Sequence, residues 1–136
     1  MDQIIELLFV SFFYLIIGGT LGVLLRLFLI RKIHFTLGLT LNNTSIVNII
    51  SSFLAGIYMA FNLTNENTNL FFSVGFLGCF STFSSFIIRL FTLIKEEKYK
   101  KFLSCYVEVL FYSSLLFGLG YFSTKNILNW KSLNYF

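Results

Sequence analysis

The sequence predicts an all-α membrane protein with four transmembrane helices, the third of them broken near its middle. Of the 136 residues, 57% are hydrophobic and only 12% are charged, whereas soluble domains carry roughly 25% charged residues. Four apolar windows each have about the 20 residues that a helix needs to cross a bilayer. The third window also holds glycines, hydroxyl residues and phenylalanines in an order that a plain membrane helix does not require.

The four spans are expected at about residues 4–30, 44–63, 70–94 and 102–122, each as long as a spanning helix. Together they form one four-span membrane domain over residues 1–136. Too little of the chain lies outside the spans for a separate soluble domain. The N-terminus lacks the basic residues that open a signal peptide, so the first span is expected to remain in the protein.

The first span carries Gly18 and Gly22, four residues apart, followed by Arg26. Small residues at this spacing let a neighbouring membrane helix approach closely, although the pair alone is a weak signal. Arg26 lies about one helical turn from the basic end of the span. The simplest interpretation of a basic residue there is that it snorkels to the headgroups. His34, in the loop that follows, is the only histidine, which excludes a multi-histidine metal site.

The second span has a face of polar and small side chains, which recur at steps of three and four residues: Asn48, Ser52, Ala55, Gly56 and Met59. An asparagine inside a membrane span costs free energy unless it is paired or faces water. Asn48 is therefore either a partner in an interhelical hydrogen bond or a donor that lines a pore.

The third span contains residues 75–86, G-F-L-G-C-F-S-T-F-S-S-F. Its glycines bring backbone flexibility, its hydroxyls compete for backbone hydrogen bonds, and Phe80, Phe83 and Phe86 share one helical face. Irregular backbone at membrane depth is tolerated only where it is buried in protein or lines a cavity. We therefore expect a helix that breaks at Gly78 and has a functional role. The alternative is an ordinary hydroxyl-rich helix packed through its phenyl rings.

Two opposite charges lie inside the third and fourth spans. Arg89 comes five residues before the end of its span, and Glu108 about six residues after the start of the next. At 1.5 Å per residue, both lie roughly 8–9 Å below the same membrane surface. An intramembrane ion pair costs much less than two lone charges, so we expect Arg89 and Glu108 to pair.

The basic residues are unevenly distributed between the two sides of the membrane. Loops rich in lysine and arginine stay in the cytoplasm, so the chain is predicted to lie in the cell membrane with both termini outside. The net charge of +4 reflects these loops and does not indicate nucleic-acid binding. The first and third loops hold six basic residues, Arg31, Lys32, Lys95, Lys98, Lys100 and Lys101, against two after the fourth span, Lys125 and Lys131.

No enzyme chemistry is apparent in the sequence. It has no acid pair on a shared polar face, no nucleophile beside a histidine and no phosphate loop. Cys79 and Cys105 have neither metal nor disulfide spacing. The spans do carry hydrogen-bond donors, such as the Asn48 amide and several hydroxyls, and phenyl rings whose edges are weakly positive. These groups suit a small anion that sheds its water, and carbonyls freed by a broken helix suit a small cation.

Three segments resemble the small fluoride channels of the Fluc/CrcB family in content, order and spacing. They are G-G-T-L-G-V-L-L-R at 18–26, V-N-I-I-S-S-F-L-A-G at 47–56 and the run at 75–86, of which the last is the most specific. The resemblance implies a fluoride-selective channel for passive export of fluoride from the cytoplasm, which lowers its toxicity. It also implies an antiparallel dimer with two fluoride pores and a central sodium ion.

The resemblance further assigns roles to the residues that match the family motifs. Sodium would be bound by the backbone carbonyls of Gly78 and Ser81. Arg26 matches the family arginine of the first span and, with Arg89 and Glu108, is expected to be structural. The fluoride path would include Asn48, Phe83, Phe86, Thr82 and Ser114, with Ser113 as the alternative to Ser114.

The chain departs from the family pattern at three positions. Ser51 stands where the family usually has glycine, and Ser81 replaces the usual threonine. Arg89 stands where the family often has glutamate. This reversal of charge puts a role of that position in the channel vestibule in doubt. Glu108 is a candidate for the negative charge that compensates Arg89. Homodimeric members insert in both orientations, a dual topology with nearly balanced loops. Six basic residues against two are not balanced, so we expect this chain to insert one way and to pair with an oppositely oriented paralogue.

Two alternative functions stay open. A small multidrug exporter is also a four-span antiparallel dimer, but that class needs a membrane-embedded glutamate in the first span, and Glu6 lies at the edge of that span. A non-conducting partner subunit of a heterodimeric channel would explain the charge asymmetry. It would not explain why donors and ring edges are aligned in the second and third spans.

Overall fold

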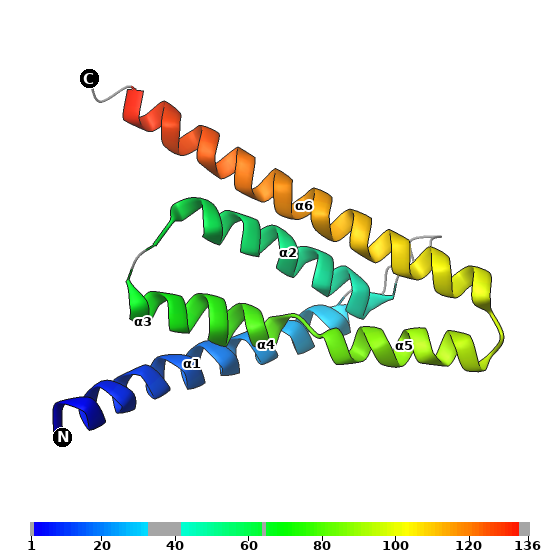
Figure 1. Ribbon diagram of the computed structural model, residues 1–136, viewed down its shortest axis with the longest axis horizontal. Helices are drawn as coiled ribbons and strands as arrows, with labels where there is room; N and C mark the ends of the chain where they lie inside the picture. The colour runs from blue at the N-terminus through cyan, green and yellow to red at the C-terminus, as the bar shows by residue number, and fades with distance from the viewer. Residues whose placement is uncertain (1, 33–41, 64, 134–136) are drawn as a thin grey trace.

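The computed structural model describes residues 2–32, 42–63 and 65–133, which are helical apart from short connections (Figure 1). Four helical segments within these residues are long and apolar enough to cross a membrane, at Leu8–Lys32, Asn43–Phe61, Glu66–Lys95 and Tyr99–Lys131. The structure therefore confirms the prediction of an all-α protein with four membrane-length helices. His34, which the sequence places in the loop after the first span, lies outside the described residues.

The helices run back and forth, so both ends of the chain lie at the same end of the molecule (Figure 1). The first and second spans are α1 (Asp2–Lys32) and α2 (Asn43–Phe61), and the fourth is α6 (Tyr99–Leu133). The third span is composite. It consists of α3 (Glu66–Asn69), the π-helix η1 (Leu70–Leu77), the single turn α4 (Gly78–Phe80) and α5 (Phe83–Lys95).

Glycines bring the helices together in two close pairs. In the pair of α1 and η1, a Cβ added at Gly18 or Gly22 would overlap the carbonyl oxygen of Phe71 or Phe76. In the pair of α2 and α6, a Cβ added at Gly56 would overlap the carbonyl oxygen of Phe117. The Gly18 and Gly22 pair therefore serves packing within one chain, since the backbones approach too closely for any side chain at these positions.

The buried core is small and lies where α5 meets α2 and α6. Most other large apolar side chains are exposed, as expected for a chain whose outer surface faces lipid. The core cluster consists of Ile49, Phe86, Leu90, Leu93, Cys105 and Val109, with Phe102 and Leu116 packed against it.

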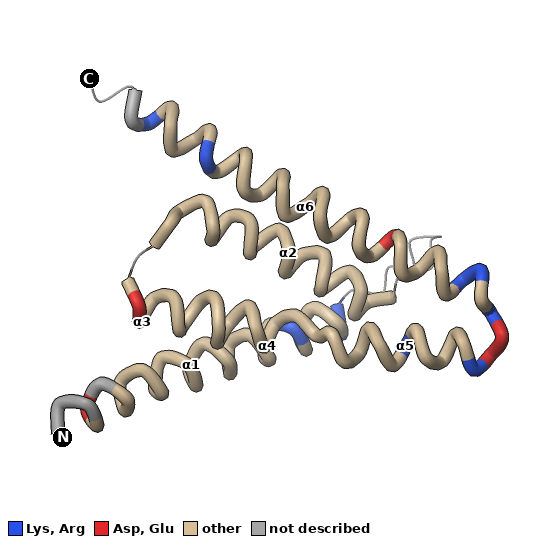
Figure 2. Tube along the Cα trace, viewed as in Figure 1, with Lys and Arg blue, Asp and Glu red and all other residues tan. Residues whose placement is uncertain are grey.

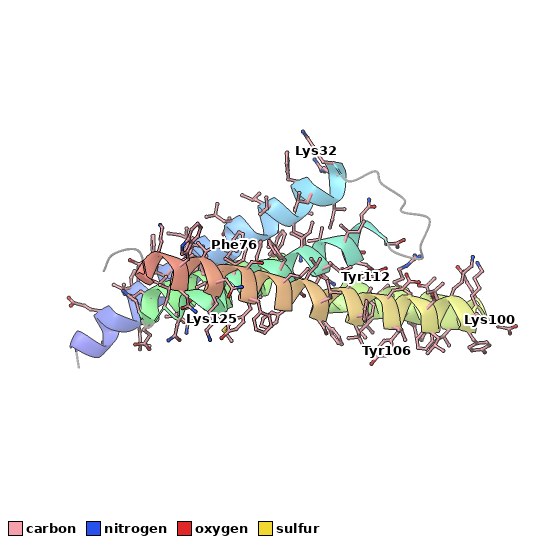
Figure 3. All side chains as sticks on the ribbon, turned by 90° about the horizontal axis from the view of Figure 1, so that it is seen from above. Lys32, Phe76, Lys100, Tyr106, Tyr112 and Lys125 are labelled. Carbon is pink, nitrogen blue, oxygen red and sulfur yellow. The ribbon has the colours of Figure 1, made fainter. Side chains whose placement is uncertain are left out.

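Most charged residues lie toward the ends of the helices (Figure 2). Figure 3 places Lys100 and Lys125, both on α6, toward opposite ends of the molecule. α6 continues well beyond the expected end of the fourth span at residue 122, as far as Leu133. Its 35 residues span about 52 Å at 1.5 Å per residue, which exceeds a bilayer core of about 30 Å.

Candidate functional site

The backbone of the third span leaves the helical conformation at Ser81 and Thr82, although the Ser81 amide still donates to the carbonyl of Leu77 at 3.0 Å. α4 ends at Phe80, Ser81 and Thr82 have extended backbone (φ −78°, ψ 150° and φ −136°, ψ 101°), and α5 begins at Phe83. The sequence placed the interruption at Gly78, but Gly78 is helical, with φ −62° and ψ −36°. The interruption therefore lies three residues later, at hydroxyl residues and not at the glycine.

Asn48 on α2 supplies the hydrogen bonds that the interrupted backbone needs. The amide N–H of Thr82 donates to Asn48 Oδ1 at 2.8 Å, and Asn48 Nδ2 donates to the carbonyl oxygen of Thr82 at 3.0 Å. In an unbroken helix the Thr82 amide would donate to the carbonyl of Gly78. Asn48 thus takes over this amide, and of the two alternatives left open by the sequence the interhelical hydrogen bond is observed.

Arg26 stabilises the same interruption from α1. Its Nη1 donates to the carbonyl oxygen of Cys79 at 3.2 Å. The last carbonyls of a helix have no helical partner and carry the negative end of its dipole, so a guanidinium there is favourable. Arg26 is only partly exposed, which places it inside the bundle and not among the headgroups.

A cleft of about 490 Å³ lies beside the interruption, between α2, the third span and α6. Its wall combines one amide, five hydroxyls and two phenyl rings with small and aliphatic side chains. Asn48 is partly exposed along this wall. The lining residues are Asn48, Ser51, Ser52, Ala55, Ser73, Leu77, Gly78, Ser81, Phe83, Phe86, Val109, Leu110 and Ser113.

The cleft brings together most of the residues that the sequence nominated. Asn48, Phe83, Phe86, Gly78, Ser81 and Ser113 all line it. Thr82 does not line it but is joined to it through Asn48, and its Oγ1 is buried without a hydrogen-bond partner in the described part of the chain. Ser114 is exposed and is not a lining residue.

The two nominated phenylalanines differ sharply in burial. Phe83 is 75% exposed, whereas Phe86 is 6% exposed and belongs to the core. Their ring centroids lie 6.4 Å apart. Phe86 also stacks on Tyr106 of α6, with ring centroids 6.4 Å apart. Phe86 is therefore fixed by packing, while the ring of Phe83 is held by few neighbours within this chain.

Three hydroxyls of the cleft, those of Ser51, Ser52 and Ser73, were not nominated for the fluoride path, although Ser52 was placed on the polar face of the second span. Ser51 follows Asn48 by three residues and so shares its face of α2, a spacing that could have identified it. Ser73 lies in the π-helix, where hydrogen bonds join residues five apart. A sequence pattern read with α-helical spacing misplaces the face of such a segment, so no signal pointed to Ser73.

Arg89 of α5 and Glu108 of α6 both lie near the buried thiol of Cys105. Cys105 itself is fully buried. Glu108 Oε1 accepts a hydrogen bond of 2.6 Å from Ser104 Oγ. The two charged residues therefore lie in one neighbourhood on facing helices, as an ion pair would require.

These features define the class: a small all-helical, multi-pass membrane protein with a polar and aromatic cleft beside an interrupted span. Comparison with known families gives a more specific assignment. The model of the family described as CrcB-like protein, camphor resistance (CrcB), matches residues 13–122. The chain belongs to the CrcB-like family.

Several relatives of known name are similar over most of their length. A protein of Prochlorococcus marinus subsp. pastoris, named fluoride-specific ion channel FluC 2, is 46% identical over 88% of this chain and 97% of its own. A second, from Prochlorococcus marinus strain MIT 9312 and of the same name, is 48% identical over 77% of this chain and 86% of its own. Fluoride-specific ion channel FluC of Pyrococcus abyssi is 37% identical over 79% and 89%.

Proposed function

We propose that this chain forms a fluoride-selective ion channel through which fluoride leaves the cytoplasm passively, and that it has no enzymatic activity. The observation that carries the proposal is the cleft itself, with Asn48, serine hydroxyls and the Phe83 ring, in a chain whose relatives are named fluoride-specific ion channels. Fluoride is strongly hydrated, so a selective path must replace its water with protein donors.

Several residues that line the cleft offer such donors. Asn48 uses one N–H of its amide for Thr82, and an amide carries two, so one remains for an anion. Ser113 adds a hydroxyl from α6, and Phe83 and Phe86 add ring edges of weakly positive potential. Thr82 Oγ1 and Ser114 complete the proposed path as hydroxyls at its margins.

The proposed channel is an antiparallel dimer. Phe83 is 75% exposed beside the cleft, and a Cβ added at Gly78 would meet only the carbonyl oxygen of Ser73, at 3.8 Å. The exposed Phe83 ring and the open backbone at Gly78 both lie beside the polar cleft. A second subunit would cover them. The excess of basic residues in the first and third loops favours a single orientation with the termini outside, so the partner is an oppositely oriented paralogue.

A sodium ion at the centre of this dimer fits the chemistry of the interruption. Because Thr82 donates to Asn48, the carbonyl of Gly78 does not receive the Thr82 amide. Gly78 and Ser81 both line the cleft, and their carbonyl oxygens are the ligand type that a small hard cation prefers. Within the described residues no cluster of histidine, cysteine or acidic side chains competes for a metal ion. When bound, sodium would neutralise carbonyl charge and join the two subunits.

Fluoride efflux from liposomes tests the function. The chain is reconstituted together with a second family member from the same genome, and released fluoride is measured with a selective electrode, with chloride efflux as the control. We expect fast fluoride efflux and little chloride efflux. Transport of organic cations without fluoride would support a multidrug exporter, and no efflux in any combination would support a non-conducting subunit.

A further inference from the structure

Ser51 is the most deeply buried hydroxyl in the wall of the cleft. Its side chain is only 5% exposed, yet it is one of the residues that line the cleft. It lies on α2 almost one turn beyond Asn48, and therefore on the same face of the helix. The little surface that Ser51 retains is surface toward the cleft.

Four other helical hydroxyls in the described part of the chain make a bond that Ser51 does not make. Thr20, Thr92 and Thr124 each donate to the carbonyl four residues earlier, at 2.8–2.9 Å. Ser52, next to Ser51, does the same toward the carbonyl of Asn48, at 3.1 Å. Ser51 makes no such bond to Val47, nor any other hydrogen bond to a residue that the structure describes.

Ser51 Oγ is not one of the fully buried polar atoms of the described chain, so this oxygen keeps some surface, and Ser51 lines the cleft. The hydroxyl is therefore open to the cleft and has no partner there from the described residues. α2 cannot easily move to supply one, because Gly56 packs directly against the backbone of α6. The remaining space next to Ser51 is the cleft, with Asn48 on one side and Ser113 across it on α6.

We infer that the Ser51 hydroxyl is a hydrogen-bond donor to the anion in the cleft and that it takes the anion over from Asn48 one helical turn further along α2. This inference rests on the proposed function, since it places a second donor in the same fluoride path. The Ser51 hydroxyl donates its hydrogen to the ion.

Single-channel recordings in planar bilayers, with fluoride as the permeant anion, test this donor. Ser51→Ala removes the hydroxyl, and Ser51→Cys keeps the volume but leaves a weak donor. Both are expected to lower the current of the pore that contains Ser51 about tenfold, the usual order for one hydrogen bond to a charged group. Ser51→Thr, which keeps a hydroxyl, is expected to stay within about twofold of the unaltered channel.

Ser45 provides the matched control, because it is 2% exposed on the same helix and does not line the cleft. Ser45→Ala should leave the current unchanged, and all four variants should elute as the unaltered dimer. Normal current in Ser51→Ala, with the unaltered channel conducting, would overturn the inference and leave the proposed function standing. Absence of fluoride current in the unaltered channel would overturn the proposed function, and the inference with it.

Discussion

The side-chain amide of Asn48 and the backbone of Thr82 exchange two hydrogen bonds, of 3.0 and 2.8 Å, between helices 34 residues apart in sequence. The bond from the Thr82 amide replaces the one that this amide would have made to the Gly78 carbonyl in an unbroken helix. Because an unpaired buried backbone group costs about 1–3 kcal/mol, the interruption at Ser81 and Thr82 is tolerable largely because Asn48 is present. One residue therefore shapes the backbone and presents a donor to the cleft.

Substitution of Asn48 by aspartate should abolish conduction by the pore that this Asn48 lines. A carboxylate can still accept from the Thr82 amide, but it cannot donate to the Thr82 carbonyl or to an anion, and its charge repels fluoride. Fluoride efflux from liposomes measures the loss. Asn126→Asp, the same change at an exposed position on α6, is the control and should conduct normally. Normal efflux from Asn48→Asp would remove Asn48 from the path.

Phe83→Ile tests the role of a ring edge. Isoleucine keeps an apolar side chain but lacks the positive rim of the phenyl ring, so the variant should fold normally and lose fluoride efflux. Phe83 has few neighbours to disturb, since it is 75% exposed. Phe91→Ile, on the same helix and 65% exposed, does not line the cleft and should retain efflux. Equal efflux from both variants would show that Phe83 acts only as apolar surface.

The membrane-length helices could be predicted from composition, because a bilayer imposes the same length and apolarity on every span. The exact interruption could not. Glycines at 75 and 78 suggested flexibility, but Gly75 packs against α1 and Gly78 is helical. The backbone leaves the helix where Asn48 can reach it, and that contact depends on how α2 packs against the third span.

The choice between Ser113 and Ser114 shows the same limit. Adjacent residues on a helix differ in direction by about 100°, so only the rotation of α6 decides which one faces the cleft. That rotation is set by close contacts such as Gly56 against Phe117, a pairing of two helices that a single sequence does not display. The π-helix likewise shifts the face of η1, which is why Ser73 was not nominated.

Gly22→Ala should destabilise the protein by about 1–3 kcal/mol, because its new Cβ overlaps the carbonyl oxygen of Phe76 and forces α1 away from the third span. Gly118→Ala is the matched change, since nothing lies within 4 Å of its Cβ. Thermal stability in detergent, followed by gel filtration, should fall for Gly22→Ala and not for Gly118→Ala. An unchanged Gly22→Ala would mean that the helices part without cost.

Reversal of single charges tests the expected pair of Arg89 and Glu108. Arg89→Glu or Glu108→Arg alone puts two like charges within the membrane and should sharply lower the yield of folded protein, whereas the double reversal should recover much of it. The exposed pair of Lys98 and Glu96, 2.7 Å apart, is the control. The Lys98 ammonium lowers the pKa of the Glu96 carboxyl, but reversal of such an exposed pair should change little. No recovery in the Arg89 and Glu108 double variant would show that the two do not pair.

The distribution of basic residues predicts a single orientation in the membrane. Six lie in the first and third loops and two after the fourth span, and such a bias retains the richer loops in the cytoplasm. In bacterial cells, alkaline phosphatase fused at the C-terminus should therefore be active, and a fluorescent protein fused there should be dark.

An antiparallel dimer needs one subunit in each orientation, so the chain alone should give little fluoride efflux, and addition of the paralogue should restore it. Comparable signals from both reporters, or robust efflux from the chain alone, would instead establish a homodimer of dual topology.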